Sequence, residues 1–285
     1  MAWVVWGIAS PLWANSGTPP AQVVGSVFEY TVQAGDTLTS IGGRFGVAVP
    51  VLIAENRLAT PDRIRPGIKL TIDNRHIVPA NLDTGMVINI PQRILFYFTA
   101  GELKATYPVA LGRPDWPTPT GKFEVASLVL NPDWHVPKSI QEEMAREEKI
   151  VTELVPAGPD NPLGTHWIGL SLAGYGIHGT SAPMSIYQFR SHGCIRLHPE
   201  DIEKLFSYLK RGFQGELAYK TVLLGQDDQG KLFLEVNPDI YRKNINALEQ
   251  ARRLADSYGV KERIDWSRVA TVIESREGIA REVSL

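Results

Sequence analysis

The stretch Ser191-His192-Gly193-Cys194-Ile195-Arg196-Leu197 contains the only cysteine of a 285-residue chain. A second marked stretch, Tyr175-Gly176-Ile177-His178-Gly179-Thr180, lies upstream and places His178 sixteen positions (194 − 178) before Cys194. A thiol with nearby histidines and flanking glycines is the set of groups that a thiolate nucleophile needs. These two stretches are therefore the main indication of both the fold and the chemistry.

The surroundings of Cys194 differ from those of a structural cysteine, which usually sits in an apolar run. A cationic neighbour such as Arg196 lowers the pKa of a thiol and raises its thiolate fraction near neutral pH. Gly193 lets a substrate approach the backbone closely, and the amides near Gly193 and Cys194 are candidates for an oxyanion hole. We therefore expect Cys194 to be a nucleophile.

Two histidines compete for the role of general base. His192 is close to Cys194 in sequence, but nearness along the chain does not guarantee the right geometry. His178 ends a predicted strand just before Gly179, where a free backbone carbonyl is available to orient the ring. If His178 is the base, His192 is a structural or substrate-orienting residue. His198 is expected to cap a helix that begins after it.

A metal site is the less favoured alternative. The potential zinc ligands are His178, His192, Cys194 and His198. None of them has the paired Cys-x₂-Cys or His-x₃-His spacing of structural or hydrolytic zinc sites. A single cysteine also excludes an intramolecular disulfide framework.

The composition bounds the class of protein. Hydrophobic residues make up 44% and charged residues 21%, which is enough for a packed core in one large domain or two unequal ones. The net charge of −2, from 29 basic and 31 acidic residues, gives no basic face for nucleic acid. Residues 1–13 are apolar, too short to span a bilayer, and resemble the h-region of a secretory signal, although no basic residue precedes Arg44. We expect an exported protein without a stable membrane span; the alternative is a disordered apolar tail.

The chain changes texture several times. Residues 15–26 read as a linker, and a strand–helix–helix–strand unit follows. Its expected elements are the strand Phe28–Val32, a helix capped by Asp36 and running to Phe45, a helix from Val49 to near Asn56, and the strand Ile68–Ile72. Because Gly42 and Gly43 lie inside the first helix, we expect that helix to be frayed.

The middle of the chain is predicted to be mainly β with inserted helices. The predicted strands are Val87–Ile90, Ile94–Phe98, Thr106–Ala110, Phe123–Ala126, Trp167–Leu170, Tyr175–His178 and Thr221–Leu224. The predicted helices are Lys138–Lys149 and one starting at Pro199, whose buried face carries Ile202, Leu205, Phe206 and Leu209. Beyond Gln226, a helix over Asn246–Tyr258 is expected to pack through Leu248, Ala251, Leu254, Ala255 and Tyr258.

The unit at residues 27–74 resembles a LysM module. The matching segments are Tyr30-Thr-Val-Gln-Ala-Gly-Asp-Thr-Leu38, Ala54-Glu-Asn56 and Ile64-Arg-Pro-Gly-Ile-Lys-Leu70. The resemblance implies binding of glycans that contain N-acetylglucosamine, through Gly35, Asp36, Thr37 and Asn56. The alternative is a small structural domain that has lost its affinity for sugar.

The segment from His178 to Leu197 resembles the active-site signature of L,D-transpeptidases of the YkuD/ErfK type. Pro117-Thr-Pro-Thr-Gly-Lys-Phe123 and Val155-Pro-Ala-Gly-Pro-Asp-Asn-Pro-Leu-Gly164 are also similar to that family, the latter closest to periplasmic members from Gram-negative bacteria. The resemblance implies a β-sandwich catalytic domain over residues 85–225, after a signal segment and linker at 1–26 and the LysM module at 27–74. Residues 226–285 form an extension to which the sequence assigns no role.

The resemblance also implies roles for individual residues. Cys194 is the nucleophile, His178 the base, and the Gly179 carbonyl orients His178, while Gly193 contributes its backbone to the oxyanion site. The substrate-binding residues are Ser191, His192, Arg196 and Tyr175. No cofactor or metal is implied, because the thiolate supplies the covalent chemistry.

The implied reaction is a two-step acyl transfer on peptidoglycan in the periplasm or cell envelope. The thiolate attacks the carbonyl of the third residue of a tetrapeptide stem, D-alanine leaves, and an amine resolves the thioester. The acceptor is left open: another stem gives a 3→3 cross-link, a lipoprotein lysine gives a wall-anchored protein, and water makes the enzyme a carboxypeptidase or thiol peptidase. A non-enzymatic wall-binding protein is the remaining alternative.

Overall fold

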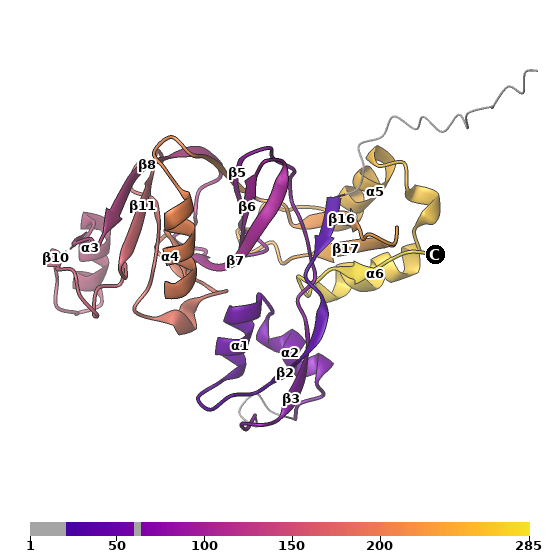
Figure 1. The fold of residues 1–285 in the computed structure, drawn as a ribbon, viewed down its shortest axis with the longest axis horizontal. Coiled ribbons are helices and arrows are strands. Elements are labelled where there is room, and N and C mark those ends of the chain that lie inside the picture. Colours follow the sequence, from indigo (N-terminus) through magenta and orange to yellow (C-terminus); the bar gives the residue numbers. More distant parts are fainter. Residues whose placement is uncertain (1–20, 60–63) are drawn as a thin grey trace, which may run out of the picture.

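The structure is a computed structural model that describes residues 21–59 and 64–285, and it contains three units (Figure 1). We call them the barrel (residues 85–218), the small unit (residues 27–73) and the terminal unit (β1, β4 and residues 222–285). The predicted export segment at residues 1–13 lies outside the described residues. Within residues 21–59 and 64–285, no single helix is long and apolar enough to cross a membrane.

The barrel is a nine-stranded sheet in which eight of the strands close into a ring. The strand order is β13-β7-β14-β12-β11-β8-β15-β5-β6, and an additional pairing of β6 with β7 completes the ring. The strands are β5 (Gly85–Asn89), β6 (Ile94–Thr99), β7 (Glu102–Gly112), β8 (Gly121–Leu130), β11 (His166–Leu170), β12 (Gly176–His178), β13 (Phe189–Ser191), β14 (Ile195–Leu197) and β15 (Gln214–Ala218). The predicted mainly β fold with inserted helices is confirmed.

Alternating side chains separate the inside of the barrel from its outer face. In β5, Met86 and Ile88 join the barrel core, whereas Val87 packs with Phe96 in a separate cluster. The helix α4 (Pro199–Tyr208) adds Ile202 and Leu205 to the core, as its apolar stripe predicts. All seven predicted strands lie on observed ones. The sequence missed three barrel strands: β13 and β14, because three-residue strands are too short to show a period, and the longer β15.

The small unit has the predicted order of elements. It consists of β2 (Val27–Thr31), α1 (Leu38–Phe45), α2 (Val49–Glu55) and β3 (Lys69–Asp73). The predicted N-cap was wrong by one residue. Thr37, not Asp36, caps α1: its hydroxyl accepts from Ser40 N at 3.0 Å while Ser40 Oγ accepts from Thr37 N at 2.9 Å. The Asp36 carboxylate instead accepts from Tyr30 Oη at 2.6 Å and from Gln33 N at 2.8 Å, which closes the preceding turn.

The predicted fraying of α1 was also wrong, because its two glycines serve close packing. A Cβ on Gly42 would lie 2.4 Å from the carbonyl oxygen of Val47, and one on Gly43 would lie 3.3 Å from that of Ile186. Both glycines are buried inside a continuous helix. They therefore permit α1 to approach its own following turn on one side and the barrel on the other, a benefit that outweighs their low helix propensity.

The terminal unit draws its strands from both ends of the chain. Its sheet has the order β18-β17-β16-β1-β4, with β1 (Ala21–Val24), β4 (His76–Ile77), β16 (Val222–Gln226), β17 (Leu232–Val236) and β18 (Arg281–Glu282). The helices α5 (Ala247–Ser257) and α6 (Trp266–Ser275) pack on one face through the apolar side chains of β16 and β17. The stripe predicted on α5 is confirmed as a packing face, except that Leu248 is exposed.

Two predicted boundaries need correction in this unit. The sequence predicts a linker over residues 21–24, but they form β1, which pairs parallel to β16 and antiparallel to β4. The prolines and glycines that precede them dominate the composition, so the pattern did not reveal a short, partly exposed strand. The strand β16, which was assigned to the catalytic domain, belongs to this sheet instead. The small unit is consequently inserted between β1 and β4, two neighbouring strands of the terminal unit.

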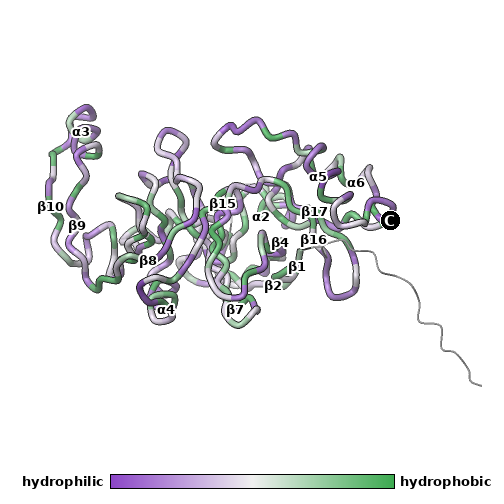
Figure 2. Tube along the Cα trace, turned by 90° about the horizontal axis from the view of Figure 1, so that it is seen from above, coloured by the Kyte–Doolittle hydropathy of each residue, from purple (hydrophilic) through white to green (hydrophobic). Residues whose placement is uncertain are grey.

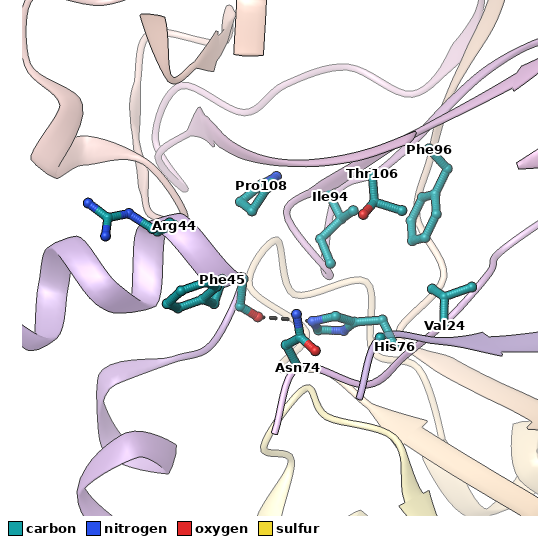
Figure 3. A pocket seen from close by; sticks show the side chains of 11 residues that line it. Val24, Arg44, Phe45, Asn74, His76, Ile94, Phe96, Thr106 and Pro108 are labelled. Carbon is teal, nitrogen blue, oxygen red and sulfur yellow. Dashed lines mark hydrogen bonds between the residues drawn. The ribbon is translucent and has the colours of Figure 1, made fainter. Parts of the chain in front are cut away.

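A buried carboxylate joins all three units. Glu235 on β17 is 0% exposed, and it accepts from His76 Nδ1 (3.2 Å), from the backbone N of Ile77 (2.7 Å) and from Gln92 Nε2 (2.9 Å). The other ring nitrogen of His76 donates to the carbonyl of Gly46, 2.9 Å away at the end of α1 (Figure 3). One polar cluster thereby links the barrel, the small unit and the terminal unit.

A second contact fixes the small unit from the far side. The guanidinium of Arg281 on β18 donates to Glu55 on α2 and to Asp73 on β3, each at 2.8 Å. Asp73 is buried and also pairs with Arg75. The small unit is therefore held by ion pairs and by two chain connections.

We predict that Glu235→Ala lowers the free energy of unfolding by about 3–5 kcal/mol, because it leaves several buried donors unpaired. The measurement is urea denaturation followed by tryptophan fluorescence. As a matched control, Glu102→Ala removes an exposed carboxylate that pairs with Lys104 and should change stability by less than about 1 kcal/mol. Equal effects of the two substitutions would contradict the assigned role of Glu235.

Candidate active site

The two marked sequence stretches meet in one large pocket. A cavity of about 940 Å³ lies between the barrel and an excursion that we call the flap (residues 131–163). The flap contains β9 (Trp134–His135), α3 (Lys138–Arg146) and β10 (Leu154–Val155), and it extends from the barrel at the end of the molecule opposite the C-terminus (Figures 1 and 2). Cys194, His178, Arg196 and Tyr175 all line this cavity.

Cys194 sits on a tight turn between β13 and β14. Gly193 has φ +103°, a left-handed conformation, and a Cβ there would lie 2.7 Å from Cε1 of Tyr175. Ser191 Oγ donates to the carbonyl of Cys194 at 2.5 Å and accepts from the N–H of Gly193 at 3.2 Å. The Ser191 hydroxyl is thus engaged within the turn. Glycine at 193 is required both by the backbone and by the ring of Tyr175.

His178 is the last residue of β12 and is 3% exposed. Its Nδ1 lies 2.7 Å from the carbonyl oxygen of Gly179, as the sequence predicted. A carbonyl only accepts, so Nδ1 carries the proton and the lone pair is on Nε2. The ring stacks on Trp167 with 5.8 Å between centroids. These contacts fix the orientation and the tautomer of His178.

Burial keeps both reacting groups neutral. It raises the pKa of the Cys194 thiol, although the backbone of Gly176 and the charge of Arg196 act in the opposite direction. Burial, followed by the charge of Arg196, lowers the pKa of His178 to about 3. The expectation that nearby cations produce a ready thiolate was therefore wrong: desolvation outweighs them. The arrangement suits a neutral imidazole that removes the thiol proton as the sulfur attacks.

Arg196 places an incompletely satisfied cation in the pocket. It lies on β14 opposite His178 of β12, and its Nε is buried without a hydrogen-bond partner among the described residues. No carboxylate of residues 21–59 or 64–285 forms an ion pair with it. A guanidinium stays charged when buried, and it is suited to bidentate recognition of a carboxylate.

His192 faces the flap. Its Nε2 contacts Glu143 of α3, and its ring meets Trp116 edge-on at 4.9 Å between centroids. Arg113 also contacts Glu143, and its hydrogen bond is the main cause that lowers the pKa of this carboxyl. From the sequence, His192 is predicted to bind or orient substrate; the structure adds a contact that ties the cysteine loop to α3. Glu143 had no local signal in the sequence that would have revealed it.

Two further predictions concern His198 and a metal site. His198 occupies the N-cap position of α4, but its side chain makes no capping hydrogen bond. Among the described residues, no three His, Cys, Asp or Glu side chains are grouped as a metal site requires.

In the small unit, Gly35 has φ +88° and forms the turn before α1. The side chain of Asn56 bonds the backbone of Leu52 and Thr71, and those of Asp36 and Thr37 are engaged in the turn and cap described above. These side chains therefore hold the loops in shape.

Comparison with known proteins places this pocket in a family. The family model described as L,D-transpeptidase catalytic domain (YkuD) matches residues 83–222, and that of the LysM domain matches residues 30–73. "Probable L,D-transpeptidase YcfS" of Escherichia coli is 32% identical over 245 residues, covering 83% of this chain and 77% of the relative. "Probable L,D-transpeptidase ErfK/SrfK" of Salmonella typhimurium is 28% identical over 279 residues, covering 93% and 90%.

Solved structures with similarity to this chain include L,D-transpeptidase 3 of Mycobacterium tuberculosis, with a TM-score of 0.38, 15% identity and coverage of 73% of this chain and 97% of that one. The L,D-transpeptidase of Mycobacterium smegmatis has a TM-score of 0.37 and 18% identity, with coverage of 70% and 94%. The sequence matches carry the assignment. This chain belongs to the L,D-transpeptidase family and combines a YkuD catalytic domain with an N-terminal LysM domain.

Proposed function

We propose that this chain is an exported peptidoglycan L,D-transpeptidase that works by cysteine-dependent acyl transfer. The observation that carries the proposal is the placement of Cys194 and of an oriented, neutral His178 in the same pocket. The substrate class is the tetrapeptide stem of peptidoglycan, and the site of action is the periplasm or cell envelope. The LysM module binds the glycan strands of the same polymer.

In the first step, Sγ of Cys194 attacks the carbonyl carbon of the third stem residue, and Nε2 of His178 takes the thiol proton. The carbonyl oxygen becomes an oxyanion that needs a backbone donor. His178 then returns its proton to the amine of the leaving D-alanine, which leaves a thioester on Cys194.

In the second step, an amine attacks the thioester and loses its proton to His178. The carbon–sulfur bond breaks, the proton returns to sulfur, and a new amide remains. The amine belongs to a second stem in a 3→3 cross-link or to a lipoprotein lysine in a wall-anchored protein. Attack by water instead of an amine gives a carboxypeptidase.

The electrostatics of the pocket support a stem peptide as the donor. Arg196 is a partly buried cation whose Nε is buried without a hydrogen-bond partner, and it has no ion-pair partner in the part of the chain that the structure describes. A stem peptide carries carboxylates on its diamino acid and its terminal residue. Pairing one of them with Arg196 satisfies the guanidinium and holds the scissile carbonyl near Cys194.

The first prediction concerns the covalent adduct. Purified protein incubated with tetrapeptide muropeptides should gain the mass of the acyl donor less D-alanine on Cys194, as measured by intact-protein mass spectrometry. Cys194→Ala should abolish the adduct, and His178→Ala should slow its formation by about 10²–10⁴-fold.

His192→Ala is the matched control and should retain far more activity, because His192 contacts Glu143 and not the Gly179 carbonyl. An adduct in Cys194→Ala would rule out the proposed nucleophile. Chromatography of the products after adding an amine acceptor separates transfer, which gives a new cross-link, from hydrolysis, which gives shortened stems alone. Absence of any adduct would leave a wall-binding protein.

The second prediction concerns pH. The lowered pKa of His178, about 3 instead of the ordinary 6.5, means that the neutral base is present at every pH above that value. The rate of acylation should therefore stay nearly constant from about pH 8 down to about pH 5 and fall only in stronger acid. The measurement is the pH profile of D-alanine release under single-turnover conditions. A decline with a midpoint near 6.5 would show that the base is solvated or is a different histidine.

The third prediction concerns the flap. Glu143 joins α3 to His192 and Arg113, so Glu143→Ala should release the flap and accelerate tryptic cleavage within residues 131–163 by about tenfold. The Michaelis constant for the stem peptide should rise with it. Glu147→Ala, on the same α3 side of the flap but paired only with exposed Lys149, is the control and should cleave like the wild type. Equal cleavage of both variants would contradict the inference that Glu143 holds the flap in place.

A further inference from the structure

The loop between β7 and β8 touches the backbone of the catalytic turn. Thr118, 2% exposed, lies in the Pro117–Phe123 stretch, for which the chemistry above has no use. Its hydroxyl accepts from the N–H of Gly112 at 2.9 Å and donates to the carbonyl oxygen of Gly193 at 2.8 Å. Because an N–H only donates and a carbonyl only accepts, the direction of both hydrogen bonds is fixed.

The carbonyl that Thr118 holds belongs to the peptide group between Gly193 and Cys194. In a planar trans peptide, the C=O and the N–H point in opposite directions. Fixing the oxygen of Gly193 therefore fixes the direction of the N–H of Cys194. That N–H makes no hydrogen bond within residues 21–59 and 64–285, whereas the neighbouring N–H of Gly193 is occupied by Ser191.

A tyrosine from the C-terminal segment holds Thr118 in turn. The hydroxyl of Tyr241 accepts from the backbone N–H of Thr118 at 3.1 Å and donates to the carbonyl of Gly112 at 2.7 Å. The Tyr241 ring stacks on Tyr219 with 5.6 Å between centroids, and the backbone N–H of Tyr241 donates to the Tyr219 hydroxyl at 2.8 Å. The Tyr241 hydroxyl thus ties Thr118 to Gly112, and the Thr118 hydroxyl joins this pair to the catalytic turn at Gly193.

The backbone segments around Gly112 are closely packed. A Cβ on Gly112 would lie 2.2 Å from the carbonyl oxygen of Trp116, 2.7 Å from the backbone N of Thr118 and 3.0 Å from Cα of Gly193. The three backbone segments are therefore in direct contact. A displacement of the loop at Thr118 passes directly to the peptide before Cys194.

We infer that Thr118 and Tyr241 are positioning residues that orient the Gly193–Cys194 peptide so that the N–H of Cys194 faces the developing oxyanion. The inference rests on the proposed acyl transfer and adds the donor that this chemistry requires. The Thr118 hydroxyl also polarises the peptide, because a hydrogen bond to its C=O strengthens the N–H as a donor. The positioning role of Tyr241 gives the segment after β17 a part in catalysis, although the sequence assigned that segment no role.

The inference separates two reactions of the same sulfur. Acylation builds negative charge on a carbonyl oxygen and depends on the oriented N–H. Alkylation by iodoacetamide depends on the thiol and its access but builds no oxyanion. Loss of the positioning hydroxyls should therefore slow acylation and leave alkylation unchanged, a pattern that general loosening of the turn would not produce.

The test uses the full chain and the variants Thr118→Val, Thr118→Ser and Tyr241→Phe. Single-turnover release of D-alanine from a tetrapeptide stem should slow by about 10–100-fold in Thr118→Val and Tyr241→Phe, below the loss of a whole oxyanion donor. The Michaelis constant and the iodoacetamide rate should stay within about twofold of the wild type. Thr118→Ser keeps the hydroxyl and should retain the wild-type rate.

Tyr208→Phe is the matched control, since this exposed tyrosine on α4 has no hydroxyl hydrogen bond among the described residues. The double variant Thr118→Val/Tyr241→Phe should be about as slow as the slower single variant, because the two residues act in one chain of bonds. Wild-type acylation rates in Thr118→Val and Tyr241→Phe, or equal losses of acylation and alkylation, would overturn the inference. If the wild type releases no D-alanine, the proposed function falls first and the inference with it.

Discussion

The buried carboxylate of Glu235 is the constraint on which the arrangement of the three units depends. A carboxylate without exposure is expensive to desolvate unless donors surround it. Here the donors come from Gln92 of the barrel and from His76 and Ile77 of β4, while the second nitrogen of His76 holds the small unit. Any shift of one unit against another leaves a buried polar group unpaired. The barrel, the LysM domain and the terminal unit therefore form one body and not a string of modules.

Hydrogen bonds to buried polar groups also fix the catalytic turn. Ser191, Thr118 and the Gly179 carbonyl each fix one backbone or ring group by a hydrogen bond whose direction is unambiguous. His178 is buried, Cys194 is partly buried and both are neutral, so the chemistry draws on orientation more than on a preformed charge. Arg196 is the exception, a cation that has no ion-pair partner among the described residues.

The sequence predicted the parts that depend on local pattern. The strands around Val87 and Ile94, the apolar stripe of α4, and the pairing of His178 with the carbonyl of Gly179 all follow from period, caps or motif. Prediction from the sequence failed where contacts between residues far apart in the chain determine the structure. Nothing near Gly42 signals that the Val47 carbonyl excludes a side chain there, and Glu235 reads as one charge in an apolar strand. Tyr241 and Thr118 are 123 residues apart, and only the fold brings them together.

The insertion of the small unit between β1 and β4 has a consequence for how the two domains share a polymer. A sugar-binding domain on a flexible tether raises the local concentration of substrate over a broad range of distances. A domain held at both ends between neighbouring strands has no such range. Under the proposed function, a stem peptide reaches Cys194 only if it projects from the glycan at a fixed distance and angle from the sugars bound to the LysM domain. Geometry along the strand, more than affinity, would then decide which stems react.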